Sequence, residues 1–167
     1  MSEKDEIFSS ETKYGGIFDF RDFYAFCHEF LSEEIGVDVS ESKYEEKIKG
    51  TEKEIVVKWD CDRKLTDYFK LIMKVEFSVR ALKNVEINSG GKKIKTNDGS
   101  IKIKVKGILE KDYQGKFESN AFNKFIRGIY EKWIIPSRIE EYENKVYGSC
   151  DKFISNAKSY LDLEGKK

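Results

Sequence analysis

Alternating apolar and polar residues in the middle of the chain predict a β-sheet. In residues 69–79 every second position is apolar and the positions between are mostly polar, which is the period of a strand with one buried face. Shorter alternating runs at 43–48 and 54–61 predict two earlier strands, with a turn at Gly50-Thr51. Val85 and Ile87 indicate a further strand that ends at 88–91.

Two more alternating runs, residues 92–96 and 101–109, flank Asn97-Asp98-Gly99. An Asp-Gly pair between such runs is a strong signal for a tight β-turn. We therefore expect the two runs to pair as a hairpin across these three residues. Together the strands predict an antiparallel meander of about five to six strands.

Helical spacing of apolar residues appears on both sides of the predicted sheet. Residues 20–31 carry one apolar stripe, with Asp19 as the expected N-cap and Gly36 as the expected C-terminal stop. After the sheet, residues 122–133 carry a second stripe, which Ser119 or Asn120 is placed to cap.

The rest of the chain predicts further helix. Pro136 should break or kink the chain near Ile135. A segment at 139–146 follows, for which Gly148 is the expected end, and a last helix covers 153–161.

This order of elements predicts an α+β fold. We expect an N-terminal helix, the antiparallel meander, and then two to three C-terminal helices that cover one face of the sheet. Residues 1–13 are polar and acidic and are expected to be a flexible tail, which leaves 14–167 as a single domain.

Composition agrees with a folded core and narrows the setting. Aromatic residues make up 14% of the chain, although 37% of residues are charged. The formal net charge is zero, which argues against a generic polyanion binder. The three cysteines are scattered, and no apolar run approaches the length of a membrane span, so we expect a cytoplasmic protein.

Groupings that carry catalytic chemistry are not evident in the sequence. His28 is the one histidine, and it points away from its neighbour Cys27 on a helix, so the two are poorly placed to share a metal. Asp60 and Asp62 lie beside cations in an expected turn. The glycine-rich stretch 88–93 lacks the spacing of a phosphate loop. We predict no catalytic residue, cofactor or metal, and we incline against an enzyme.

Lysines form the most distinctive polar pattern. Six lie on the predicted hairpin and two on the preceding long strand: Lys92, Lys93, Lys95, Lys102, Lys104, Lys106, Lys70 and Lys74. Three roles are open for these lysines. They protect a solvent-facing sheet from the addition of a strand, they bind the phosphates of a nucleic acid, or they contact an acidic protein surface. A nucleic-acid role is weakly supported, because readers of single strands also expose aromatic residues for stacking.

Large apolar residues on the strands and the helix at 122–133 form a second set. They are Trp59, Phe69, Met73, Phe77, Phe125, Ile129 and Trp133. We expect them to be a solid core, with the lining of an apolar ligand pocket between sheet and helix as the alternative. A further alternative is that Trp133 or Ile134 is exposed to a partner or to a membrane interface.

Three segments, residues 107–118, 133–140 and 157–165, give the chain a resemblance to small uncharacterised archaeal proteins from small-genome lineages. The likeness extends from about Tyr14 to the C-terminus. It implies an archaeal cytoplasm and a domain that stands alone. It assigns no activity, cofactor or functional residue.

The sequence as a whole favours a non-catalytic binding or scaffolding module, whose partner is another protein or a second copy of itself. The alternatives are an apolar small-molecule or lipid pocket, and weak nucleic-acid binding through the lysines. No membrane span is expected.

Overall fold

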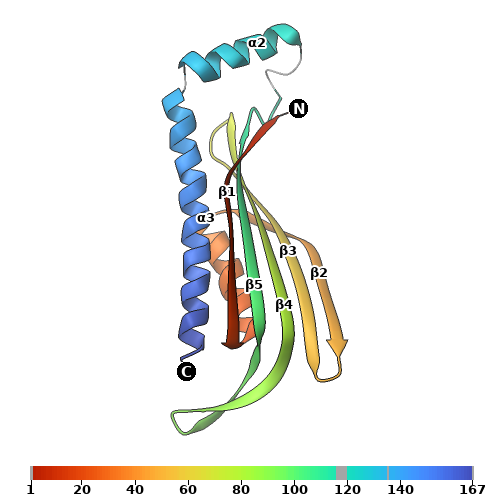
Figure 1. Cartoon of the computed structure of the whole chain (residues 1–167). Helices are drawn as coiled ribbons and strands as arrows, with labels where there is room; N and C mark the ends of the chain where they lie inside the picture. The colour runs from red at the N-terminus through yellow and green to blue at the C-terminus, as the bar shows by residue number, and fades with distance from the viewer. Residues whose placement is uncertain (1, 116–119, 135, 167) are drawn as a thin grey trace.

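One five-stranded antiparallel sheet organises the protein, as the computed structural model shows (Figure 1). The structure describes residues 2–115, 120–134 and 136–166. The strands lie in the order β1-β5-β4-β3-β2. Their bounds are β1 (Glu3–Ile17), β2 (Asp38–Lys49), β3 (Glu52–Lys64), β4 (Phe69–Ser89) and β5 (Lys92–Lys111). The predicted α+β class and antiparallel sheet are therefore confirmed.

Helices connect and follow the strands. They are α1 (Phe20–Glu29) with its π-helical continuation η1 (Phe30–Ile35), α2 (Ala121–Ile129) with η2 (Tyr130–Ile134), and the long α3 (Pro136–Glu164). Helices α1 and α3 pack on one face of the sheet, and α2 lies across one end of the molecule (Figure 1).

The chain begins with a strand and not with the predicted tail and helix. Strand β1 pairs with β5 from Glu3↔Lys111 to Ile17↔Asp98, so the last strand of the meander is covered by the first strand of the chain. This strand was not predicted, because a bulge between Glu6 and Phe8 interrupts the alternation of apolar and polar residues. Its side chains are mostly polar, as is usual at a sheet edge.

The predicted turn at Asn97-Asp98-Gly99 is also wrong, because β5 runs through it without a break. The hairpin instead turns at Gly90 and Gly91, both of which have positive φ, so the predicted strand end at 88–91 is confirmed as the turn. Gly99 serves another purpose: a Cβ there would lie 3.0 Å from the Cα of Leu82 and 3.1 Å from the Arg80 oxygen. It faces a register shift between Arg80 and Lys83, where Ala81 has a φ of 53°. The glycine thus permits close approach of two strands at a bulge.

Helix boundaries follow several of the predicted signals. Asp19 caps α1 by accepting a hydrogen bond from the Asp22 N–H, Asn120 caps α2 in the same way through Asn123, and Gly36 ends η1 with a φ of 78°. Helix α3 begins at Pro136 but continues past Gly148, so the predicted division at that glycine is wrong. An interior glycine costs a long helix only about 1 kcal/mol, which packing can offset.

A single core lies between the sheet and the helices α1 and α3. On α1, Phe23 contacts Phe77 of β4 with ring centroids 5.7 Å apart, and Phe77 lies edge-on to Trp59 of β3 at 5.0 Å. Helix α3 comes close to β5 at Gly107, where a Cβ would lie 2.5 Å from the Cys150 Sγ. One sheet face is therefore filled with apolar side chains, and none of the described helices lies on the other face (Figure 1).

Candidate functional site

The open face of the sheet carries five of the predicted lysines. The buried residues of β4 and β5 alternate with Lys70, Lys74, Lys102, Lys104 and Lys106. Because successive side chains of a strand point to opposite faces, these five lie on the face away from α1 and α3. This part of the prediction is consistent with the structure.

Acidic residues are interleaved with those lysines. Glu11 of β1 approaches the Nζ atoms of both Lys102 and Lys104, at 3.7 and 3.9 Å. Asp62 of β3 lies 2.9 Å from the Nζ of Lys70. The open face is thus a mixed-charge surface, because strands distant in sequence bring carboxylates to it.

The other three lysines lie elsewhere. The turn at Gly90-Gly91 places Lys92, Lys93 and Lys95 on a β4–β5 arm that extends beyond the other strands (Figure 1). Lys95 is cross-strand from Glu86. The expected single hairpin face of six lysines is therefore not formed.

The predicted apolar set divides into two groups. Trp59, Phe69, Met73 and Phe77 are buried in the core, as predicted. Phe125, Ile129 and Trp133 are exposed, so the prediction that these three belong to the core or line a pocket is wrong. The alternative that Trp133 is exposed is confirmed, and the side chain of Ile134 lies outside the part that the structure describes. The apolar pocket, which was the alternative to a solid core, is not formed by these residues.

A groove of about 550 Å³ lies at the base of the arm and is open to solvent. Asp19, Arg21, Glu86, Lys95 and Asn97 are among its lining residues. Its walls are charged and polar, so it differs in place and chemistry from the apolar pocket that the sequence suggested.

Helix α2 with η2 presents its apolar side to solvent. Phe122, Phe125 and Trp133 are 68%, 64% and 72% exposed, and Ile126 and Ile129 are exposed beside them. Their spacing of three to four residues places all five on one side of the helix. We call these five residues the apolar face. A surface helix of a globular protein normally turns such a stripe toward its core.

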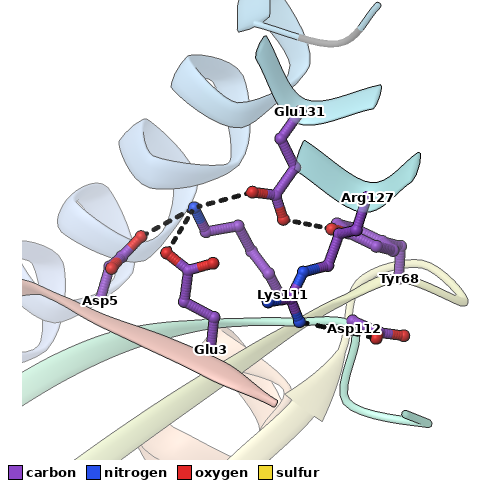
Figure 2. A network of polar contacts seen from close by, with 7 residues as sticks. All are labelled: Glu3, Asp5, Tyr68, Lys111, Asp112, Arg127 and Glu131. Carbon is purple, nitrogen blue, oxygen red and sulfur yellow. Dashed lines mark hydrogen bonds and ion pairs between the residues drawn. The ribbon is translucent and has the colours of Figure 1, made fainter. Parts of the chain in front are cut away.

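The polar side of the same helix faces the body of the protein (Figure 2). Arg127 Nη1 lies 3.8 Å from Oδ2 of Asp112, whose side chain is only 2% exposed. Glu131, one turn further, lies with Oε2 3.9 Å from Nζ of Lys111 and accepts a hydrogen bond from the Tyr68 hydroxyl. The helix is thus attached through ion pairs, and its apolar face points away from them.

Lys111 is at the centre of this attachment. Its side chain is 8% exposed, and its Nζ lies 2.9 Å from Asp5 and 3.6 Å from Glu3, both on β1. Asp112 follows at the end of β5 with a φ of 53°, and its N–H donates a 2.8 Å hydrogen bond to the Tyr68 carbonyl. The anchor network, as we call Glu3, Asp5, Tyr68, Lys111, Asp112, Arg127 and Glu131, joins β1, the end of β5, α2 with η2, and the β3–β4 loop (Figure 2).

Within the anchor network, Lys111 stays protonated and the Tyr68 phenol stays neutral. Burial alone would lower the pKa of Lys111, but the hydrogen bond to Asp5 and the charges of Glu131 and Glu3 outweigh it and raise that pKa. Burial, followed by the hydrogen bond to Glu131, raises the pKa of the Tyr68 phenol. A general acid or base works best with a pKa near the working pH, and both of these shifts lead away from neutrality. The network is therefore suited to hold a helix in place.

The other side chains that could carry chemistry, the cysteines and Asp62, are either buried or paired with another residue. Cys27, Cys61 and Cys150 are buried free thiols, and burial raises the pKa of each. Asp62 binds Lys70, as described above. In the described ranges, no cluster of three or more histidine, cysteine or acidic side chains is arranged to hold a metal ion.

No protein-family model, curated protein sequence or solved structure was found to match the chain. Across the part of the chain that the structure describes, no helix has the length and apolar character needed to cross a membrane.

Sequence reasoning missed the anchor network and found the apolar face without its orientation. The network draws on residues 3, 5, 68, 111, 112, 127 and 131, and nothing in their linear spacing connects them. One signal was present: Arg127 and Glu131 are four residues apart, on the side of the helix opposite to the apolar stripe. Their buried partners at the end of β5 show which side of the helix meets the body.

Proposed function

We propose that the protein is a non-catalytic binding module that docks onto a larger surface through the apolar face of α2 and η2. One observation carries the proposal: the helix is attached to the body by its polar side, which leaves its apolar side without a covering element among the described residues. Exposed apolar clusters of this kind mark interaction sites in stable proteins.

The alternatives gain less support. Nucleic-acid binding through the lysines is disfavoured, because Glu11 and Asp62 pair with three of them. Three others lie on the β4–β5 arm, apart from the open face of the sheet. An apolar ligand pocket is disfavoured because Phe125 and Trp133 face solvent. The cytoplasmic location and archaeal origin that the sequence suggests belong to this proposal as expectations.

A photo-crosslinking amino acid at position 125 tests the docking function without assuming the partner. We expect benzoylphenylalanine at Phe125 of the full chain, irradiated in the expressing cells, to give covalent adducts with lipid or protein. The matched control is the same residue at Ile94, which is exposed on the arm. No adduct at position 125, or equal yields at 125 and 94, would contradict the proposal.

A further inference from the structure

The charges beside the apolar face suggest the chemistry of what it meets. The segment 120–134 contains three basic residues, Lys124, Arg127 and Lys132, and one acidic residue, Glu131. Arg127 and Glu131 are turned toward the body and held in the anchor network. Lys124 and Lys132 are exposed. Lys132 lies beside the apolar face, with its Nζ 5.5 Å from the ring centroid of Trp133, whereas Lys124, three residues before Arg127 and seven before Glu131, lies on the polar side of the helix. The exposed edge of the apolar face is therefore cationic, and it complements an anionic surface.

A second copy of the chain is a poor match for this surface. Two copies of the helix packed through their apolar faces would bring their Lys132 residues near each other, and the segment has no exposed acid to pair with them. Three aromatic residues, each about two-thirds exposed, offer on the order of 400 Å². Even with the two isoleucines, this falls short of the ~800 Å² that each partner contributes to a stable interface.

A lipid surface requires neither an exposed acidic residue on the helix nor an interface of this area. An interfacial helix needs a face of Trp, Phe, Ile or Leu that enters the headgroup region by about 5–10 Å, and lysines or arginines that meet anionic headgroups. It does not need a partner of complementary shape. Trp133, with Lys132 5.5 Å from its ring centroid, fits the interfacial position that tryptophan favours.

The arrangement of the elements allows such contact. Helix α2 crosses one end of the molecule, away from the C-terminus and from the β4–β5 turn (Figure 1). Because its polar side is attached to Asp112 and Lys111 at the end of β5, its apolar face is directed outward from that end. The helix can lie along a membrane surface while the sheet projects away from it.

We infer that α2 and η2 dock the protein on the surface of an anionic lipid membrane, with the apolar face in the headgroup region and Lys132 at the phosphates. This inference rests on the docking function proposed above and adds its partner. Each lysine near such a surface contributes a factor of about five in binding. Removing the charge of Lys132 should therefore weaken binding roughly fivefold.

Flotation of the purified full chain with lipid vesicles provides the first test. We expect the protein to float with vesicles of phosphatidylcholine and phosphatidylserine and to bind vesicles of phosphatidylcholine alone roughly fivefold more weakly. Phe125→Ser with Trp133→Ser should reduce binding at least tenfold, and Lys132→Gln should abolish the preference for phosphatidylserine. Ile94→Ser, on the exposed arm, is the matched control and should bind normally. The substituted positions are all exposed, so the variants should remain folded, which circular dichroism checks.

Tryptophan fluorescence gives a second readout. Trp59 is buried and Trp133 is exposed, so a blue shift on adding vesicles reports on Trp133, and Trp133→Phe should remove the shift while flotation persists. Flotation that is absent, that persists in the Phe125→Ser/Trp133→Ser variant, or that is equal on both vesicle types would overturn the inference. A blue shift that grows with protein concentration without lipid, together with a dimer in light scattering, would also overturn it in favour of a second copy. That last result would leave the proposed docking function standing, whereas protein adducts without lipid adducts at position 125 would indicate a protein partner.

Discussion

Single residues in this protein decide how closely elements approach. Gly107 lies where α3 crosses β5, and a Cβ there would meet the Cys150 Sγ at 2.5 Å and the Val146 Cγ1 at 3.0 Å. Gly148 lies on α3, and a Cβ added there would have no atom within 4 Å apart from the backbone of its own helix. The two glycines therefore differ in their surroundings: Gly107 allows a second element to approach closely, and Gly148 faces open space.

Gly107→Ala should destabilise the protein by about 1–3 kcal/mol, because the added methyl group forces α3 away from β5. Gly148→Ala is the matched control and should stabilise the protein by up to about 1 kcal/mol, since it removes a helix-interior glycine in open space. Urea unfolding followed by circular dichroism measures both. Equal shifts of the same sign would show that α3 does not rest on Gly107.

At the scale of elements, α2 and η2 are held by charge, whereas α1 and α3 are held by apolar packing. No residue of α2 is buried, and its attachment depends on Lys111 and Asp112 at the end of β5. Helix α3 buries seven residues, including Phe153 and Leu161. We therefore expect α2 to come loose well before the sheet unfolds.

Lys111→Met tests this difference, because it removes the cation that Glu3, Asp5 and Glu131 share. Leaving carboxylates without their partner should lower the free energy of unfolding by about 1–3 kcal/mol, less than for a fully buried pair because Glu3 and Asp5 are partly exposed. Amide hydrogen exchange should accelerate first in α2. Lys102→Met, which affects an exposed pair with Glu11, should change stability by less than about 1 kcal/mol. Unchanged exchange in α2 would refute the anchoring role of Lys111.

At the scale of the whole molecule, the core buries ionisable groups in their neutral form. Burial, with the charges of Asp60 and Asp62, raises the pKa of Cys61 to about 12, and burial raises the pKa of Cys150 to about 12. An unfolded thiol has a pKa of about 8.5. When the folded pKa is the higher one, the contribution to stability is complete below the unfolded pKa and is lost as pH rises toward the folded value.

Stability should therefore fall from about pH 9 upward, with each of these thiols contributing a slope of up to about 1.4 kcal/mol per pH unit. Urea unfolding with a reductant present, repeated at neutral pH and between about pH 9 and pH 11, measures the slope. Cys150→Ala lowers stability at every pH by leaving a small cavity, but its alkaline slope should be shallower than that of the wild type. An identical slope in the two proteins would mean that Cys150 ionises as readily in the folded state as in the unfolded state.

The sequence by itself determined the features that depend on local periodicity and capping. The alternation in 69–79 places one face of β4 in the core, Asp19 and Asn120 cap the predicted helices, and Gly36 ends η1, because these signals act over a few residues. The antiparallel α+β class followed from the order of such elements.

Only the tertiary structure decided the features that depend on distant partners. It added β1, whose pairing with β5 brings Glu11 to the lysines, and it continued β5 through the predicted turn at Asn97-Asp98-Gly99. It also turned the apolar side of α2 outward, because Asp112 and Lys111 hold Arg127 and Glu131 on the opposite side. A periodic pattern shows that a helix has an apolar side, but the contacts made by its other side decide whether that side faces the core or the solvent.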